Sequence, residues 1–568
     1  MHWKFIDSDT ESIARLKRDF RCSEIIARVM ANRGLTSVRD SKPFFNPSLD
    51  QLHDPFLMKD MDRGVMRIRE NITKKIPILV FGDYDVDGTT GASMLFLALR
   101  MLGAEVSTYI PDREREGYGL SLQGIDRAKS IGADLIITCD CGINAFNQVA
   151  YANSRGIDVI ITDHHTPDET LPEAVAILNP KRRDCDYPFK GLCGGGVAFK
   201  LVFALAEEMG VDFDQILDLL DLITLGTAAD IVPILEENRV IVHHGLEMLP
   251  VHGRPGLKAL LETAGLLDKT LSVGQLVFGL APRINAAGRL GDANRAVELL
   301  TTSDFERARE LARELDRENR RRQEIQQTVV DEAIRMANAH LDPDNEFAVV
   351  LAGYGWHPGV VGIVASRIRE EFHRPAIIIS IDENGLGKGS ARSIPGLDLY
   401  QVLTNVSEYL EGYGGHPMAA GLTLREDNFI AFRNAFIAKA NELLSPRDLE
   451  PSITLDGEMR LTDINGRFMD FLEKLGPYGP GNMRPKFAAR RVEVVGNPRV
   501  IGNGDHIRFK VRQGHTVYPA IGFNQSQHYE KLIKGFPVDL AFIVEINEWQ
   551  GQTTIQLNIR DIKLSNIR

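Results

Sequence analysis

Three aspartates stand at alternate positions in the stretch VFGDYDVDGTT, where the apolar run IPILV ends. They are Asp83, Asp85 and Asp87, and in an extended loop their side chains would share one side. Carboxylates that lie close together repel one another, and ionised ones are costly to desolvate unless a cation lies among them. The stretch therefore predicts either a loop open to solvent or a bound metal ion.

Two further apolar segments end in residues of the same chemical kind. The segment ADLIITCD ends in Asp140, and IDVIITDHH ends in Asp163, His164 and His165. For any one of these aspartates alone, a turn residue or a helix N-cap is the better interpretation, and a histidine pair in a loop is usually just solvated. Because the carboxyl ends of parallel strands face one crevice, three such ends in succession favour a shared site. Carboxylate oxygens with imidazole nitrogens suit Mn²⁺ or a similar divalent ion.

The number of candidate ligands indicates more than one ion. About six side chains exceed what one catalytic ion needs while it keeps a position for water. Two ions about 3.5–4 Å apart that share a bridging carboxylate are the arrangement that serves phosphoryl transfer. Asp140, which lies between the other two clusters in the sequence, is the natural bridge.

The segments that must position these residues alternate between strand and helix patterns from residue 76 onward. Such alternation is typical of βαβ units and a parallel sheet. Residues 304–341 contain no proline or glycine and are dense in charge, which predicts one long, largely exposed helix. The expected parts are a helical N-terminal segment (1–70), a parallel-sheet α/β domain (71–300), a connecting helix (301–342), a second α/β domain (343–445) and a small β-barrel or sandwich (446–568).

Composition limits the class of protein. The chain has 568 residues, too many for one core, and its 43% hydrophobic and 25% charged residues are ordinary for a soluble globular protein. Because the net charge is −12, a nucleic acid would have to be met by a local basic surface. The five cysteines contain no C-x-x-C pair, which argues against a zinc ribbon and a disulfide framework. The charged N-terminus does not resemble a signal peptide and no apolar run approaches membrane-spanning length, so we expect a cytoplasmic protein.

Eight ordered motifs resemble one family. The strings DYDVDG, TCDCG, DHH and GTAADIVP resemble the DHH superfamily of phosphoesterases. The strings RINAAGRL, GWHPGVVGIVASR, KGSARS and GGHPMAAG resemble, within it, the bacterial exonucleases specific for single-stranded DNA. The resemblance covers nearly the whole chain and implies a C-terminal OB-like β-barrel. It also implies two divalent ions, Mn²⁺ or Mg²⁺, held by the aspartates of the first motif, Asp140, His164 and Asp230.

The resemblance separates the roles of these residues. Asp230, the aspartate of GTAAD, lies in a helical region where the strand-end pattern does not find it. His165 is expected to donate a proton or contact the scissile phosphate, and Asp163 to shape its loop. How the three aspartates of the first motif divide the ions stays open, since one could instead orient other ligands.

Basic residues near the predicted crevice could hold phosphates of a substrate. Arg113 follows a strand end in YIPDREREGYG, although an ion pair with Glu114 or Glu116 would explain it about equally well. Arg283 and Asn285, in the motif RINAAGR, are candidates for contacts to phosphate or to the rim of the metal site.

The second α/β segment offers a clearer set. GLGKGSARS supplies Lys388, Ser390 and Arg392, whose charge and hydrogen bonds suit phosphate oxygens. It is no G-x-x-x-x-G-K-[ST] motif, so ATP hydrolysis is not expected. The resemblance assigns Ser390, Arg392 and His416 to the nucleotide at the 5′ end of a strand. His357, in GWHPGVVG, is a further candidate that could assist them.

Three other stretches have two explanations each. Basic and aromatic residues interleave in DHIRFKVRQGHTVYPAIGF, as in surfaces that bind single strands, but a barrel core would also explain the aromatics. Basic residues at 181–183 and 320–322 could guide DNA, although solvated surface is the default. Gly194–Gly196 could contact phosphate at a helix start, but tight packing is the better interpretation.

The sequence supports the hypothesis of a metal-dependent hydrolase that degrades single-stranded DNA from the 5′ end to mononucleotides, in DNA repair and recombination. We expect a monomer, with single-stranded DNA and a single-strand-binding protein as partners. The alternatives are a DHH phosphodiesterase acting on short oligoribonucleotides or cyclic dinucleotides, a catalytically silent DNA-binding protein, and an inorganic pyrophosphatase. The filled ligand positions argue against the silent protein, and the long chain with its β-rich domain argues against the other two.

Overall fold

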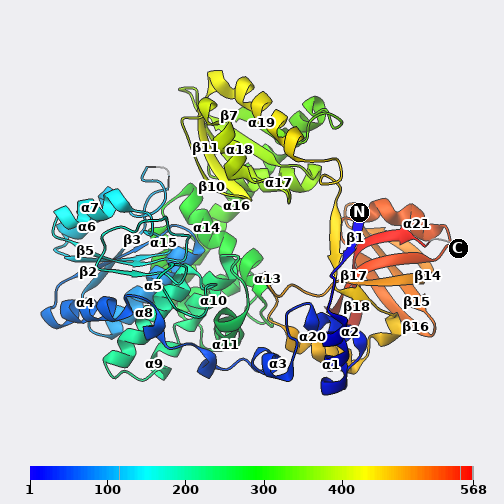
Figure 1. Ribbon diagram of the computed structural model, residues 1–568, viewed down its shortest axis with the longest axis horizontal. Helices are drawn as coiled ribbons and strands as arrows, with labels where there is room; N and C mark the ends of the chain where they lie inside the picture. Colours follow the sequence, from blue (N-terminus) through cyan, green and yellow to red (C-terminus); the bar gives the residue numbers. More distant parts are fainter. Residues whose placement is uncertain (114, 550–551, 566–568) are drawn as a thin grey trace. The chain divides into compact units, whose positions relative to one another are not determined.

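Figure 1 shows the computed structural model, which describes residues 1–113, 115–549 and 552–565. The chain forms two compact units. One comprises Met1–His2, Asn285–Asp292 and Arg313–Ser452, and the other Trp3–Ile284, Ala293–Ala312 and Ile453–Arg568. In the described part of the chain, no helix is both long and apolar enough to cross a membrane.

The larger unit contains a five-stranded parallel sheet, which confirms the predicted α/β class. The strand order is β3-β2-β4-β5-β6, and every neighbouring pair is parallel. The strands are β2 (Ile78–Gly82), β3 (Val106–Tyr109), β4 (Leu135–Cys139), β5 (Asp158–Thr162) and β6 (Ala176–Leu178), the last of which the sequence pattern did not reveal. Strands β2 and β4 are buried along their whole length, as expected for a parallel sheet covered on both faces.

Helices cover both faces of this sheet (Figure 1). On one face, apolar side chains of α6 (Leu122–Ser130) and α7 (Phe146–Ser154) form a core with alternate residues of the strands. The helices α4 (Met61–Lys74), α5 (Val86–Met101) and α8 (Gly194–Glu208) lie on the other face. Further helices follow in the chain: α9 (Asp214–Leu217), α10 (Leu220–Ala229), α11 (Glu236–His252), α12 (Pro255–Thr263), α13 (Val273–Gln275), the π-helical turn η3 (Leu276–Leu280), α14 (Ala281–Leu290) and α15 (Asn294–Thr301).

The predicted long helix is α16, which runs without a break over Phe305–His340. Apolar side chains of its C-terminal part, including Val330 and Ala333, form a core with α17 (Val361–Phe372) on one face of a second sheet. The opposite face packs against α18 (Leu399–Asn405) and α19 (Phe429–Leu443). This sheet has the order β10-β11-β9-β8-β7, and only its β7–β8 pair is parallel. Its strands are β7 (Val349–Tyr354), β8 (Ala376–Ile381), β9 (Leu386–Arg392), β10 (Gly412–His416) and β11 (Ala419–Arg425).

The C-terminal strands close into a barrel, as the resemblance implied. Five strands follow one another around it in the order β14-β15-β16-β18-β17, and pairing of β14 with β17 completes the circle. They are β14 (Phe487–Ile501), β15 (His506–Gln513), β16 (Thr516–Gly522), β17 (Val538–Trp549) and β18 (Gln552–Leu564). The short strand β13 (Gly457–Glu458) adds to β14, and α21 (Tyr529–Ile533) connects β16 to β17.

The N-terminal residues pack against this barrel, an association that no sequence pattern revealed. Strand β1 (His2–Phe5) pairs with β12 (Ser452–Leu455), and helices α1 (Thr10–Phe20) and α2 (Glu24–Ala31) share one hydrophobic core with the barrel. The buried Arg239 of α11 ties the same region to the parallel-sheet domain, since it donates to the carbonyls of Phe44 at 2.8 Å and Gly476 at 2.6 Å.

Candidate metal centre and substrate surface

The first acidic motif is divided between a loop and a helix start. Asp83 follows β2 and is buried, whereas Asp85 is the N-cap of α5 and accepts a hydrogen bond from Gly88 N at 3.0 Å. Asp87 lies in the first turn of that helix. The expectation of an extended loop was therefore wrong: the helix begins at Val86, because a capping aspartate satisfies its first amides.

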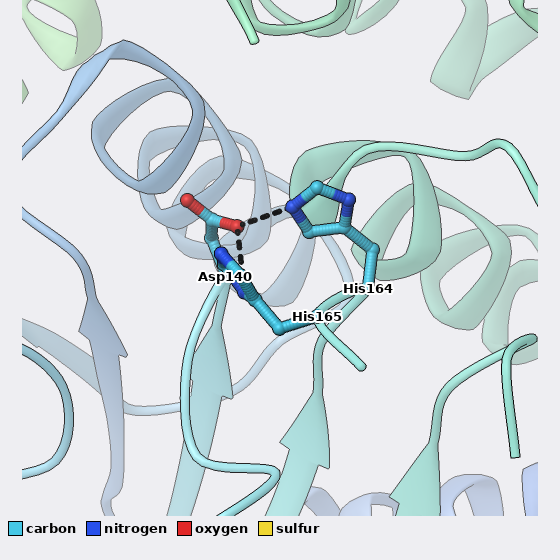
Figure 2. A group of neighbouring side chains, drawn as sticks. All are labelled: Asp140, His164 and His165. Atoms are coloured by element: carbon cyan, nitrogen blue, oxygen red, sulfur yellow. Dashed lines mark ion pairs between the residues drawn. The ribbon is translucent and has the colours of Figure 1, made fainter. Parts of the chain in front are cut away.

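Asp140 stands at the end of β4 in an unusual backbone conformation. Its φ of 62° lies in the left-handed region, which aspartate and asparagine adopt more readily than most residues. Its Oδ1 lies 3.2 Å from Nε2 of His164 and 3.8 Å from Nδ1 of His165 (Figure 2). The turn thus directs the carboxylate towards both histidines that follow β5.

Asp163 shapes the histidine loop. Its Oδ1 accepts hydrogen bonds from the backbone amides of His164 at 2.7 Å and His165 at 3.0 Å, and lies 2.7 Å from His165 Nδ1. Its Oδ2 accepts from Ile143 N at 3.0 Å. Both oxygens are thereby occupied within the loop, which leaves the histidine rings to face the cluster.

Asp230 joins the cluster from a different part of the fold. It is the C-cap of α10, and its Oδ2 lies 3.4 Å from Nε2 of His164. The strand-end argument could not find it, because the helix approaches the sheet edge from outside the βαβ pattern.

Several atoms of the cluster lack a protein partner. Within the described residues of the cluster, five buried atoms form no hydrogen bond: Asp83 Oδ1, Asp140 Oδ1, His164 Nδ1, His164 Nε2 and Asp230 Oδ2. Their close approaches lack hydrogen-bond geometry, and buried polar atoms are rarely left this way. The potential ligand atoms fall into three overlapping groups, each within 4.8 Å: Asp83, Asp85 and Asp140; Asp87, His164 and Asp230; and Asp140, His164 and His165. Asp140 and His164 each belong to two groups, and of these two side chains the carboxylate is the one with two oxygens to offer.

The electrostatics of the cluster also favour a bound cation. Burial and the negative charge of Asp85 raise the pKa of Asp83 and raise that of Asp87 to about 6. Burial and the charge of Asp87 raise the pKa of Asp140 well above its usual range and that of Asp230 to about 9. Burial together with the neighbouring His165 lowers the pKa of His164 to about 3, so this ring is neutral and able to ligate. Divalent ions would replace the protons that the carboxylates otherwise hold.

These pKa values predict that the metal-free protein loses stability as the pH rises. Asp87 and Asp230 are protonated in the folded state up to about pH 6 and about pH 9, whereas their unfolded pKa is near 4, so the unfolded state binds fewer protons between these values. The free energy of unfolding should fall by about 1 kcal/mol per pH unit for each group that is still protonated in the folded state, and of these two groups only Asp230 remains so above about pH 6. Thermal unfolding in EDTA from about pH 6 to about pH 9 measures this fall, and saturating Mn²⁺ should reverse it, since binding releases the protons. A chelated protein whose melting temperature is flat over this range would contradict the assignment.

Gly194 and Gly195 bind the cluster through their backbone amides. Gly194 N donates to Asp87 Oδ2 at 2.6 Å and Gly195 N to Asp87 Oδ1 at 3.1 Å, so the N-terminus of α8 binds this carboxylate. A Cβ at Gly194 would lie 2.5 Å from Cβ of Asp140. Tight packing against Asp140 and Asp87, rather than contact with a substrate phosphate, explains Gly194 and Gly195.

Arg113 and two tyrosines lie beside the cluster. The Arg113 guanidinium lies over the Tyr84 ring, 5.2 Å from its centroid, and its charge opposes the burial that raises the pKa of Asp83. Glu116, one of its two suggested ion-pair partners, instead accepts hydrogen bonds from Tyr109 and Ser121, and Glu114 lies outside the described residues.

The sequence interpretation missed Tyr118. Its hydroxyl donates to the Asp140 carbonyl at 3.1 Å and lies 3.2 Å from His165 Nδ1.

The motif RINAAGR is split between the two units. Arg283 belongs to the unit that contains the metal cluster and bonds back to the Gly279 carbonyl, whereas Asn285 begins the part of α14 that belongs to the other unit. In that unit, Arg289 donates to the Gly359 carbonyl at 2.9 Å. His357 accepts from Gly359 N at 3.0 Å and so lies close to the start of α17.

The second sheet brings three of the predicted phosphate contacts together. Arg392 Nη1 donates to Ser390 Oγ at 3.0 Å, and both lie against Gly362 in the first turn of α17. Arg392 pairs across the sheet with Ala419, which pairs with His416, so Arg392 and His416 share one row two strands apart. Lys388, Ser390 and Arg392 alternate along β9 and share one face, where the neighbouring strands carry mostly glycine and alanine. This face therefore places the charged groups of Lys388 and Arg392 beside backbone that short side chains leave accessible.

The remaining basic stretches differ in exposure. On the barrel, Arg508, Lys510 and Arg512 alternate along β15 and point outward. Of the cluster at 181–183, Arg182 is buried between Asp60 and Asp184, so it serves packing and not DNA. Arg322 of the cluster at 320–322 is likewise buried, with its guanidinium on Asn319 and Gln326.

Comparison with known proteins matches each part of this arrangement. Residues 77–227 match the DHH family N-terminal domain, residues 344–442 the DHHA1 domain and residues 455–561 the RecJ OB domain. The single-stranded-DNA-specific exonuclease RecJ of Escherichia coli K12 is 36% identical over 95% of this chain and 95% of its own length. The corresponding protein of Bacillus subtilis is 37% identical over 100% of this chain and 71% of its own length. The chain belongs to the RecJ family.

Solved structures of the RecJ family agree with the fold and with the donor set. The crystal structure of Thermus thermophilus RecJ in complex with Mn²⁺ matches 100% of this chain and 80% of its own, with a TM-score of 0.84 at 30% identity. A Mg²⁺ complex of the same protein matches with a TM-score of 0.79. The carboxylate oxygens left without partners here suit both ions, and the imidazole nitrogens suit Mn²⁺ better than the harder Mg²⁺.

Proposed function

We propose that this chain is a metal-dependent exonuclease that degrades single-stranded DNA from the 5′ end and releases 5′-mononucleotides. The observation that carries the proposal is the buried carboxylate and imidazole cluster, whose unpartnered atoms call for divalent cations, in a chain of the RecJ family. Repair and recombination of DNA in the cytoplasm are the processes that this activity would serve.

The cluster residues would hold two ions, Mn²⁺ or Mg²⁺. Asp83, Asp85, Asp140, His164 and Asp230 would be ligands, with Asp140 as the bridge. Bound divalent ions supply charge for the scissile phosphate and lower the pKa of water, so that hydroxide is available at neutral pH. Asp87 accepts hydrogen bonds from two amides of α8, so it would either support the other ligands without binding an ion or bind an ion weakly.

His165 is the proton donor in this proposal. Burial disfavours its charged form, but the hydrogen bond and charge of Asp163 outweigh this and raise the pKa of His165. With Nδ1 engaged by Asp163, the charged ring would present Nε2 to the scissile phosphate or the leaving oxygen. Arg113 beside the cluster would contribute a further positive charge.

The polarity of degradation would come from the second sheet. Arg392, Ser390 and His416 would bind the 5′ end, with His357 and Asn285 in support and Arg283 on the metal-bearing unit. The exposed basic row of β15 on the barrel would bind the strand further from its end. A single-strand-binding protein as partner and a monomeric state complete the proposal.

Arg392→Ala tests the assignment of the 5′ end. Removing a charge-assisted contact worth about 1.5–3 kcal/mol should raise KM for a 5′-phosphorylated strand about 10-fold or more, with kcat changed less. Steady-state kinetics should also show that any preference of the parent for 5′-phosphate over 5′-hydroxyl disappears. Arg425→Ala is the matched control and should behave like the parent. Arg425 lies on β11, six residues beyond Ala419, the residue that pairs with Arg392. If Arg392→Ala lowered kcat/KM equally for 5′-phosphorylated and 5′-hydroxyl strands, the proposed contact with the 5′-phosphate would be refuted.

A substrate comparison decides between this function and its alternatives. The protein is incubated with single-stranded DNA, matched duplex, two- to five-residue oligoribonucleotides (about the size a small site accepts) and cyclic dinucleotides, each with Mn²⁺ and with EDTA. We expect turnover of single-stranded DNA only, and only with metal. Turnover of the short ribonucleotides alone would instead assign the chain to the small-substrate phosphodiesterases.

A further inference from the structure

Ile231 adopts a backbone conformation that its side chain disfavours. It follows Asp230 directly, and its φ of 60° lies in the left-handed region. For a β-branched residue this is a genuine outlier, because the branched Cβ crowds the backbone there. The side chain gains little burial in return, since it is 77% exposed. An exposed isoleucine held in a strained conformation calls for a reason.

The chain on both sides of Ile231 imposes this conformation. On one side, Asp230 N donates to Gly226 O at 3.0 Å and closes α10. On the other, Ile234 N donates to Pro480 O at 2.8 Å, and Asn238 Nδ2 donates to Pro233 O at 3.0 Å. The turn therefore sends the Asp230 carboxylate inward, to 3.4 Å from His164, while Ile231 projects into solvent at the rim of the metal cluster.

Glycine or asparagine would take this backbone conformation with less strain, so the backbone alone does not explain isoleucine. The position of Ile231 next to the metal cluster indicates what its side chain would contact. A phosphate at the metals carries a sugar and a base, and an unpaired base offers an apolar face that a paired and stacked base does not. Apolar side chains such as isoleucine pack against base faces in other nucleic-acid complexes.

We propose that Ile231 packs against the unpaired base of the nucleotide whose phosphate lies at the metal centre. The proposal rests on the proposed nuclease function and deepens it, because the contact selects strands with accessible bases. The strain at Ile231 is then the consequence of placing an apolar contact next to a metal ligand.

The test compares Ile231→Gly and Ile231→Asn with the parent on two strands, one normal and one with abasic residues near its 5′ end. Both variants suit a left-handed backbone, so the melting temperature of the holoprotein should be retained or rise. On the normal strand we expect kcat/KM to fall about 5- to 50-fold, mainly through KM, as for loss of one base contact. On the abasic strand the parent should fall to the level of the variants, and the variants should lose nothing further.

Lys75→Gly is the matched control, since Lys75 also has a positive φ, of 53°, and ends α4 as its C-cap. It should leave the kinetics unchanged. Unchanged KM in both Ile231 variants, or equal losses on normal and abasic strands, would overturn the proposal. A lowered melting temperature of Ile231→Gly would also overturn it, because Ile231 would then pack against the protein. A parent that cleaves no single strand would contradict the proposed function itself.

Discussion

Asp140→Asn is expected to lose exonuclease activity by more than about 100-fold, which exceeds the usual cost of changing a residue that only supports a metal ligand. Asp140 Oδ1 is buried without a hydrogen bond, and Asp140 belongs to two of the three ligand groups. In the proposed arrangement its charge would serve both ions. Asparagine is the informative replacement because it tolerates the φ of 62° at this position, where alanine would add strain. Steady-state hydrolysis of single-stranded DNA in Mn²⁺ measures the loss.

The thermal stability of this variant separates a lost metal site from a misfolded protein. Replacing a carboxyl group that is costly to ionise with a neutral amide should leave the melting temperature in EDTA unchanged or higher, since burial and the neighbouring carboxylates disfavour the ionised form. The rise in melting temperature on adding Mn²⁺ should be largely lost. Asp126→Asn, on the exposed surface of α6, is the matched control and should keep both activity and the Mn²⁺ effect. An Asp140→Asn protein that retains the full Mn²⁺ effect would show that Asp140 is no ligand.

Gly194→Ala should reduce activity by up to about 100-fold, the range found for groups that position metal ligands. The added Cβ would lie 2.5 Å from Cβ and 2.6 Å from Oδ1 of Asp140, distances that force either the helix start or the ligand to move. The same shift would weaken the two amide bonds to Asp87. We also expect a loss of about 1–3 kcal/mol in stability from overpacking. Titration with Mn²⁺ should show weaker binding.

Gly196→Ala, two residues along the same helix, is the matched control. Its Cβ would meet its nearest neighbours at 3.4 and 3.5 Å, which is ordinary contact. Alanine is the better helix former by about 0.5–1 kcal/mol, so stability should be equal or higher and activity unchanged. If both alanine variants lost activity alike, a general intolerance of α8 would explain the result better than contact with Asp140.

The parallel sheet and its acidic edge could be predicted because they follow from local pattern. Apolar strands that alternate with helices specify the sheet, and Asp140, His164 and His165 stand directly after such strands. Asp230 could not be predicted in this way, because a helix outside the pattern carries it to the cluster. The start of α5 could not be predicted for a different reason: the three aspartates of the first motif are equally good caps by residue type, and the structure makes Asp85 the cap.

Other features depend on close approach between distant segments. That Gly194 meets Asp140 and that Tyr118 meets His165 are tertiary facts with no signal in spacing. Arg182 reads as surface charge in the sequence but is buried between two aspartates. The strain at Ile231 is equally invisible, since it arises from hydrogen bonds on both sides of the residue.

The most direct test of the central claim uses one strand labelled at either end. The parent protein and Asp140→Asn are incubated in Mn²⁺ with 5′-labelled and 3′-labelled single-stranded DNA, beside matched duplex. The account predicts that labelled mononucleotide appears first from the 5′-labelled strand, that the 3′ label is retained on shortening fragments, and that duplex and the variant give almost nothing. Release of mononucleotide first from the 3′ label, or equal release by Asp140→Asn, would contradict it.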